Sequence, residues 1–204
     1  MTKRRESFFW TSYSDLMTSL FFIMLVLFVL VIVLLYKRME VTQNQLDEIR
    51  RVVESTKDLD STYFEYRDGY KKYVLKIAVE FPKGKSVLTD VGNDKLEPLY
   101  NAGRVIQQFL KNHRDHQYLL IVEGQASKDN YMYNYELSYQ RALGLMRFWM
   151  QDRGLDFGEN CEIQIAGSGD GLLNTRSMRE MNERQNQRFL IHILPKNVIK
   201  DDKR

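Results

Sequence analysis

The stretch FFWTSYSDLMTSLFFIMLVLFVLVIVLL, from Phe8 to Leu35, decides the architecture of this chain. From Leu16 to Tyr36 every residue is apolar except Thr18 and Ser19. A helix of about 20 apolar residues crosses the roughly 30 Å hydrocarbon core of a bilayer. A cleaved signal peptide would have a shorter apolar core and a small-residue cleavage site, whereas this run continues directly into YKRMEV. We therefore predict a transmembrane helix over residues 8–36.

Basic residues flank this run on both sides. Lys3, Arg4 and Arg5 precede it, and Lys37 and Arg38 follow it. Positive residues are retained on the cytoplasmic side of a membrane, and the chain's amino group adds to the first cluster. We therefore expect residues 1–7 to be a short cytoplasmic N-terminus, with the rest of the chain beyond the membrane.

Asp15 stands at the edge of the apolar run. A carboxylate in mid-membrane costs on the order of 3 kcal/mol and usually faces a cavity, a partner or an ion path. Thr11, Thr18 and Ser19 are three or four positions from Asp15, so they share its helix face. This gathering indicates an ion carrier with a polar face. The alternative is that Asp15 lies at the interface and contacts lipid headgroups.

The overall composition excludes several classes of protein. The 204 residues include 30 Lys and Arg against 27 Asp and Glu, a near-balance that argues against direct nucleic-acid binding. A single cysteine, Cys161, excludes an intramolecular disulfide framework. His113, His116 and His192 lack metal-ligand spacing, and no nucleophile–base pair is evident. We expect no enzyme activity, no cofactor and no metal.

Residues 37–72 separate the apolar run from the rest of the chain, and we predict a linker helix there. Met39, Leu46 and Val53 recur every seven residues, which is typical of a self-pairing helix. The pattern spans few heptads, so a solvated linker helix is the alternative.

Residues 73–195 show strand and helix patterns in alternation. Strands are predicted at 73–81, 118–124, 161–169 and 188–195, and helices at 88–113, 133–154 and 177–187. Such alternation predicts an α/β domain in which helices cover a mixed β-sheet. The last residues, 196–204, read as a tail.

Several motifs resemble one bacterial family. WTSYSDLMTSLFFIMLVLF resembles the membrane segment of MotB-family stator subunits, in which an Asp precedes an apolar residue and Met-Thr or Met-Ser. VEGQAS, YNYELSYQRA and NQRFLIHI are similar to three segments of the OmpA C-terminal domain. The resemblance implies a single membrane helix followed by an OmpA-like periplasmic domain.

The resemblance also implies a peptidoglycan site. Tyr133, Asn134, Leu137 and Arg141 would line it, with the planar guanidinium of Arg141 holding a carboxylate of diaminopimelate. Asn134 could both cap the helix start and face the ligand. The alternative for these residues is an ordinary amphipathic helix with an N-cap. The family usually has an Asp for the ligand ammonium where this chain has Ser127, and Asp129 two residues later could substitute. We expect both Ser127 and Asp129 to line the site.

Among MotB-like proteins, the short linker and compact domain resemble most closely ZorB, the stator-like subunit of Zorya antiphage defence systems. That resemblance implies a homodimer of this chain within five MotA- or ZorA-like subunits in the inner membrane, driven by H+. The alternatives are a flagellar MotB-type stator subunit and a passive tether between membrane and cell wall.

Overall fold

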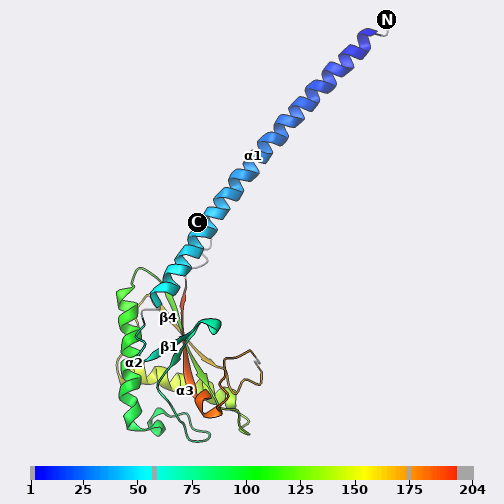
Figure 1. Cartoon of the computed structure of the whole chain (residues 1–204). Helices are drawn as coiled ribbons and strands as arrows, with labels where there is room; N and C mark the ends of the chain where they lie inside the picture. The colour runs from blue at the N-terminus through cyan, green and yellow to red at the C-terminus, as the bar shows by residue number, and fades with distance from the viewer. Residues whose placement is uncertain (1–2, 57–58, 174–175, 197–204) are drawn as a thin grey trace. The chain divides into compact units, whose positions relative to one another are not determined.

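The computed structural model of the chain describes residues 3–56, 59–173 and 176–196, and they fall in two compact units, Met1–Asp47 and Glu48–Arg204. In chain order the helices and strands are α1 (Lys3–Thr56), β1 (Phe64–Arg67), β2 (Lys72–Leu75), α2 (Asn93–Asn112), β3 (Tyr118–Gln125), α3 (Asn134–Arg147), β4 (Cys161–Gly167) and β5 (Arg188–Pro195) (Figure 1). Short turns of 3-10 helix occupy Asp68–Tyr70, Leu88–Val91 and Glu183–Asn186, and a π-helical turn, Phe148–Asp152, extends α3.

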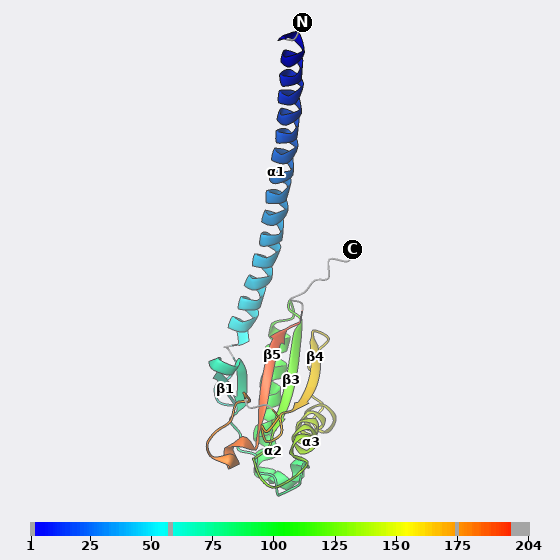
Figure 2. The same cartoon turned by 90° about the vertical axis from the view of Figure 1, so that its right-hand side faces the viewer.

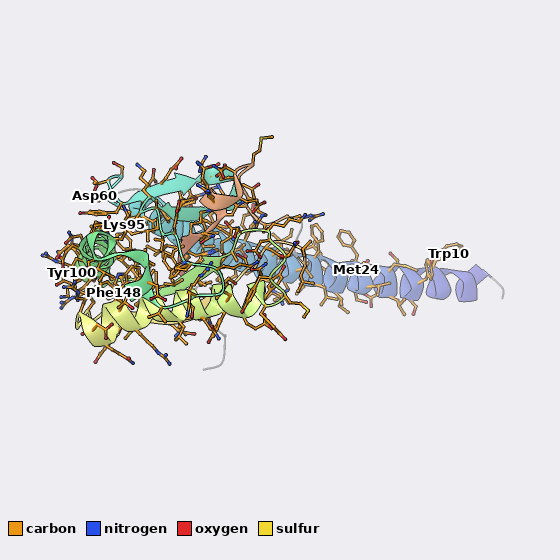
Figure 3. All side chains as sticks on the ribbon, turned by 90° about the horizontal axis from the view of Figure 1, so that it is seen from below. Trp10, Met24, Asp60, Lys95, Tyr100 and Phe148 are labelled. Atoms are coloured by element: carbon orange, nitrogen blue, oxygen red, sulfur yellow. The ribbon has the colours of Figure 1, made fainter. Side chains whose placement is uncertain are left out.

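The first unit is a single stretch of α1. Among the described residues, this is the one helix long and apolar enough to cross a membrane. Its side chains from Leu16 to Tyr36 are exposed on all faces except at Ile32, as Figure 3 illustrates with Met24. A helix that is apolar all round requires apolar surroundings. Further along, Met39 and Leu46 are exposed, while the side chain of Val53 lies outside the described ones, so self-pairing stays a prediction.

The second unit is built on a five-stranded sheet in the order β1-β2-β5-β3-β4. β3 and β4 pair in parallel, and the other neighbouring pairs are antiparallel. Figure 2 shows α2 behind β5 and β3, and α3 by the lower ends of β3 and β4. On β3, Tyr118, Leu120 and Val122 alternate into the core on that helical side. The prediction of an α/β domain with a mixed sheet packed against helices is confirmed.

The two helices are joined by aromatic contacts. Tyr100 on α2 and Phe148 at the end of α3 are both labelled in Figure 3. The guanidinium of Arg153 lies 5.0 Å from the centre of the Tyr100 ring and 5.2 Å from that of Phe148. Trp149 Nε1 donates to the carbonyl of Leu99 at 2.7 Å, which pairs the buried indole with α2.

The opposite face of the sheet carries a charged cluster across three strands. Glu123 of β3 is 7% exposed, and its Oε2 accepts from Lys72 Nζ of β2 at 2.8 Å and lies 2.7 Å from His192 Nε2 of β5. Burial acts to raise the pKa of Glu123, but the bonds from His192 and Lys72 outweigh it and lower that pKa to about 2. The carboxylate therefore stays ionised at neutral pH.

The linker prediction was wrong in its second half. α1 ends at Thr56, and Phe64–Arg67 forms β1 instead of continuing a helix to residue 72. Asp60 organises the turn, because its carbonyl accepts from the N–H groups of Tyr63 and Phe64 and its side chain accepts from Thr62 N. An Asp that bonds backbone in this way favours a turn over a helix.

Two predicted elements are shorter in the structure. The strand expected over 73–81 ends at Leu75, and Phe81 N donates to the Gln187 side chain at 3.1 Å rather than to a strand. The helix expected over 177–187 is reduced to Glu183–Asn186. Asn186 accepts from Glu180 N at 2.8 Å and donates to Glu180 O at 3.0 Å, so a side chain satisfies backbone groups that a helix would use.

Candidate functional site

The candidate site lies where β3 and β4 end and α3 begins. Gly124 and Gly167 are register partners on these parallel strands, and α3 crosses directly over them. A Cβ at Gly124 would collide with Ser138 O, and one at Gly167 would lie 2.6 Å from Tyr139 N. The two glycines therefore let the helix approach the sheet closely, which brings its first turn beside the loops that follow both strands.

Asn134, the first residue of α3, joins two carboxylates. Its Nδ2 lies 3.1 Å from Asp129 Oδ1 and 3.4 Å from Asp170 Oδ2, and the side chain is buried. The predicted capping role of Asn134 was wrong, because Tyr133 holds the N-cap position and no side chain caps it. An amide that donates to both carboxylates holds the two loops together at the helix start.

Arg141 supplies a buried positive charge two turns along α3. It is 3% exposed, its Nε donates to Lys85 O at 3.0 Å, and its guanidinium lies 4.4 Å from the centre of the Phe81 ring. Burial lowers the pKa of Arg141 to about 10, while the Asp129 carboxylate acts in the opposite direction. Within the described part of the chain, Nε makes the hydrogen bond of this guanidinium, so its two terminal nitrogens are available as a donor fork.

Asp129 provides the opposite charge. Its side chain is exposed, and Oδ1 accepts from Tyr131 N at 2.9 Å as well as from Asn134. A carboxylate has about four acceptor sites, so this geometry leaves room for a ligand cation. Asp129 and Arg141 together offer an anion and a cation at one place, which suits a ligand with both charges.

Ser127 is placed differently from the expectation that it lines the site. Its hydroxyl accepts from Gln187 Nε2 at 3.3 Å, and the same amide, through its oxygen, accepts from Phe81 N. Ser127 thus helps to hold Phe81, the ring beneath Arg141. The other two predicted residues differ in exposure: Leu137 is buried, whereas Tyr133 is 54% exposed beside the site.

Sequence reasoning missed Phe81, Lys85, Asp170 and Gln187. Asp170 follows β4 in the turn GSGDG, and the carboxyl ends of neighbouring parallel strands meet at one edge of a sheet. That rule could have found Asp170. The other three contribute through a backbone carbonyl, a ring face and an amide, and nothing in the sequence pattern marks such roles.

A comparison with protein-family models finds no match, and a comparison with curated proteins finds none either. Solved structures do resemble the chain. The periplasmic domain of Helicobacter pylori MotB is 17% identical, with 65% of this chain and 78% of that one covered at a TM-score of 0.44. A putative MotB-like protein from Desulfovibrio vulgaris is 12% identical, with 77% and 98% covered at 0.45.

The OmpA-like domain of FopA1 from Francisella tularensis is 19% identical, with 65% of this chain and 79% of that one covered at a TM-score of 0.38. The structural neighbours are therefore MotB-like and OmpA-like periplasmic domains.

A second candidate site is the carboxylate of α1. Asp15 is exposed, and the described part of the chain offers it no hydrogen-bond donor. Thr18 Oγ1 donates to Ser14 O at 2.6 Å and Ser19 Oγ to Leu16 O at 2.9 Å, so both hydroxyls are bonded to their own helix. The side chain of Thr11 lies outside the described ones. The three described polar groups share a face, with the carboxylate left free to meet another molecule.

Proposed function

We propose that this chain is an ion-driven motor subunit of a bacterial inner membrane, which carries protons on Asp15 and holds peptidoglycan with its α/β domain. The observation that carries the proposal is an acidic side chain at the edge of the apolar run of α1, with no donor for it in the described part of its own chain. A membrane carboxylate of this kind marks an ion path or a partner.

The aromatic residues of α1 support a position for Asp15 inside the membrane. Trp10 and Tyr13 are exposed near one end of the apolar run and Tyr36 at the other. Trp and Tyr concentrate at the two membrane interfaces. At about 1.5 Å per residue, Trp10 and Tyr36 are about 39 Å apart along the helix, close to the thickness of a bilayer with its headgroups. Asp15 then lies about 7.5 Å inward of Trp10 along the helix, at the edge of the hydrocarbon.

In the proposed mechanism, two copies of the chain place their Asp15 side chains against a ring of five MotA- or ZorA-like partner subunits. Protonation neutralises one Asp15 and lets it leave a polar contact. Loss of the proton restores the charge and engages the next contact, which advances the ring. The short linker favours a ZorB-type role in antiphage defence over a flagellar one.

The domain would anchor the motor by binding the free end of diaminopimelate. The terminal nitrogens of Arg141 suit its carboxylate, because a guanidinium fork binds a carboxylate with two parallel bonds. Asp129 would accept its ammonium, since Ser127 is engaged with Gln187. This pairing would allow wall binding with a serine at the position where the family that the sequence resembles has an aspartate.

The ion-carrier role is tested by Asp15→Asn. We expect loss of proton flux in vesicles that contain the purified assembly, with membrane insertion and assembly unchanged, because the amide has similar size but cannot ionise. Asp47→Asn is the matched control on the same helix outside the apolar run, and it should retain full flux. Normal flux and function in the Asp15 variant would leave the passive tether as the better description.

Wall binding is tested by Asp129→Asn in a sedimentation assay with purified peptidoglycan. The amide oxygen can still accept from Tyr131 N, so the turn should persist while affinity falls about tenfold or more through loss of a charge-assisted bond. Asp156→Asn is the matched control, because Asp156 Oδ1 also accepts from the N–H two residues later, at Gly158. Equal retention of both variants would remove Asp129 from the site.

A further inference from the structure

Four tyrosines fall within the segment YMYNYELSY, which runs from the loop after β3 into α3. The first two, Tyr131 and Tyr133, form an edge-to-face pair with ring centres 6.0 Å apart and planes at 70°. Between them, Met132 is 84% exposed, and Tyr133 itself is 54% exposed. The segment therefore presents a small aromatic surface, defined here as Tyr131, Met132 and Tyr133, which the core does not require.

This aromatic surface is held in place by the candidate site. Tyr131 N donates to Asp129 Oδ1, the carboxylate assigned to the ligand ammonium. The Tyr131 ring also faces Gly84, where an added Cβ would lie 3.6 Å from Cε2 of the ring. Tyr133 directly precedes Asn134, which bonds the same carboxylate. One ring is therefore anchored, and the other stands free at its edge.

Exposed apolar patches beside a polar site mark ligand-binding surfaces. A tyrosine presents an apolar ring face with a hydroxyl at its tip, so it suits ligands that are apolar on one face and polar at the rim. A pyranose ring has this character, because its C–H groups point to one face and its hydroxyls lie around the edge.

We propose that this aromatic surface binds sugar rings of the glycan strand that carries the stem peptide. The inference rests on the proposed wall binding, since a stem peptide held by Arg141 and Asp129 brings its own glycan with it. Reach supports the assignment: Tyr133 is four residues from Asp129, a span of at most about 14 Å. The stem of L-Ala, D-Glu and diaminopimelate, three residues counted from the sugar, covers a comparable length.

The test uses the full chain in detergent and three probes in isothermal titration calorimetry. They are the tripeptide L-Ala–D-Glu–meso-diaminopimelate, the same tripeptide attached to GlcNAc–MurNAc, and glycan strands stripped of peptide. We expect the disaccharide to strengthen binding of the tripeptide roughly tenfold, the scale of covering one aromatic face. The peptide-free strands should bind weakly.

In Tyr133→Ala, the ratio between the two tripeptide affinities should fall to about one, and binding of peptide-free strands should be lost. Tyr133→Phe should retain most of the ratio, because the ring face remains. Tyr139→Ala removes another exposed tyrosine of α3, 44% exposed and outside the pair, and should keep the wild-type ratio.

The outcomes separate the two proposals. If the disaccharide adds nothing in the wild-type chain, or if the ratio survives in Tyr133→Ala, the glycan assignment is overturned while tripeptide binding still stands. If the tripeptide alone does not bind but peptide-free strands do so through Tyr133, the assignment of the stem site fails and the glycan surface holds. Circular dichroism of each variant confirms that the fold is unchanged.

Discussion

Arg141 and Asp129 show how single residues acquire their roles from their surroundings. Arg141 is nearly covered, yet its ring contact with Phe81 and its bond to Lys85 O hold it in one orientation. A guanidinium held in advance loses less rotamer entropy when it binds a carboxylate. Asp129 is exposed but fixed through Tyr131 N and Asn134. Both charges are therefore oriented before any ligand arrives.

The lowered pKa of Glu123 predicts that the domain loses stability in acid. Its pKa of about 2 lies below the ordinary value of 4.5, so its contribution to stability is complete above pH 4.5 and is lost as the pH falls towards 2. Glu123→Gln should cost about 2 kcal/mol at neutral pH by leaving Lys72 and His192 without their anion. It should also flatten the decline in stability between those pH values, as measured by urea unfolding.

Glu162→Gln is the control for that series. Glu162 on β4 pairs with Lys196 at 2.6 Å, but both side chains are more than 40% exposed. An exposed pair adds little to stability, so the midpoint of unfolding should barely move. Equal losses in the two variants would contradict the role given to burial at Glu123.

At the scale of elements, the approach of α3 to the sheet depends on Gly124. We predict that Gly124→Ala destabilises the domain by roughly 3 kcal/mol, because its methyl group would meet the backbone carbonyl of Ser138 rather than a flexible side chain. Fluorescence of Trp149 during denaturation measures the loss. Gly69→Ala should stay within about 0.5 kcal/mol, since nothing lies within 4 Å of the added Cβ.

The elements that could be predicted from sequence are those with strong periodicity and deep burial. Strands β3 and β5 match the expected ranges closely, because alternate residues such as Leu120 and Ile191 are fully buried. The helix expected over 177–187 failed because Asn186 bonds the backbone of Glu180, a contact that periodicity cannot reveal. β1 was missed since four residues give too short an alternation to detect.

In the candidate site, too, local sequence patterns were informative and contacts between distant residues were not. Asn134 and Arg141 were predicted from their positions in a helix motif, and both are buried at the candidate site. Ser127 was expected to face the ligand, but its hydroxyl bonds to Gln187, which lies sixty positions away in sequence. Partners brought together by folding over such a separation leave no local pattern.

At the scale of the whole molecule, the proposed orientation places residue 3 and the domain on opposite sides of the membrane. We predict that Lys111→Cys, on exposed α2 surface, is labelled by an impermeant maleimide in cells with a permeabilised outer membrane, whereas Lys3→Cys is not. Both variants are made with Cys161→Ser, although burial already raises the pKa of Cys161 to about 11 and slows its reaction. The reverse labelling pattern would contradict the proposed orientation and indicate the opposite one.

The sheet order has a mechanical consequence for the proposed role, in which the domain would hold a wall under tension. The chain enters the sheet at β1, one edge, whereas the candidate site follows β3 and β4 at the other edge. A force between β1 and the site is transmitted through the strand pairings that lie between them. The pairing with the fewest residues is β2–β5, in which Tyr73 pairs with Ile191 and Val74 with Leu190. The bond from Lys72 to Glu123 reaches from β2 to β3 across that pairing, with His192 of β5 on the same carboxylate. The charged cluster therefore strengthens the β2–β5 pairing, which has the fewest paired residues and would otherwise separate first under load.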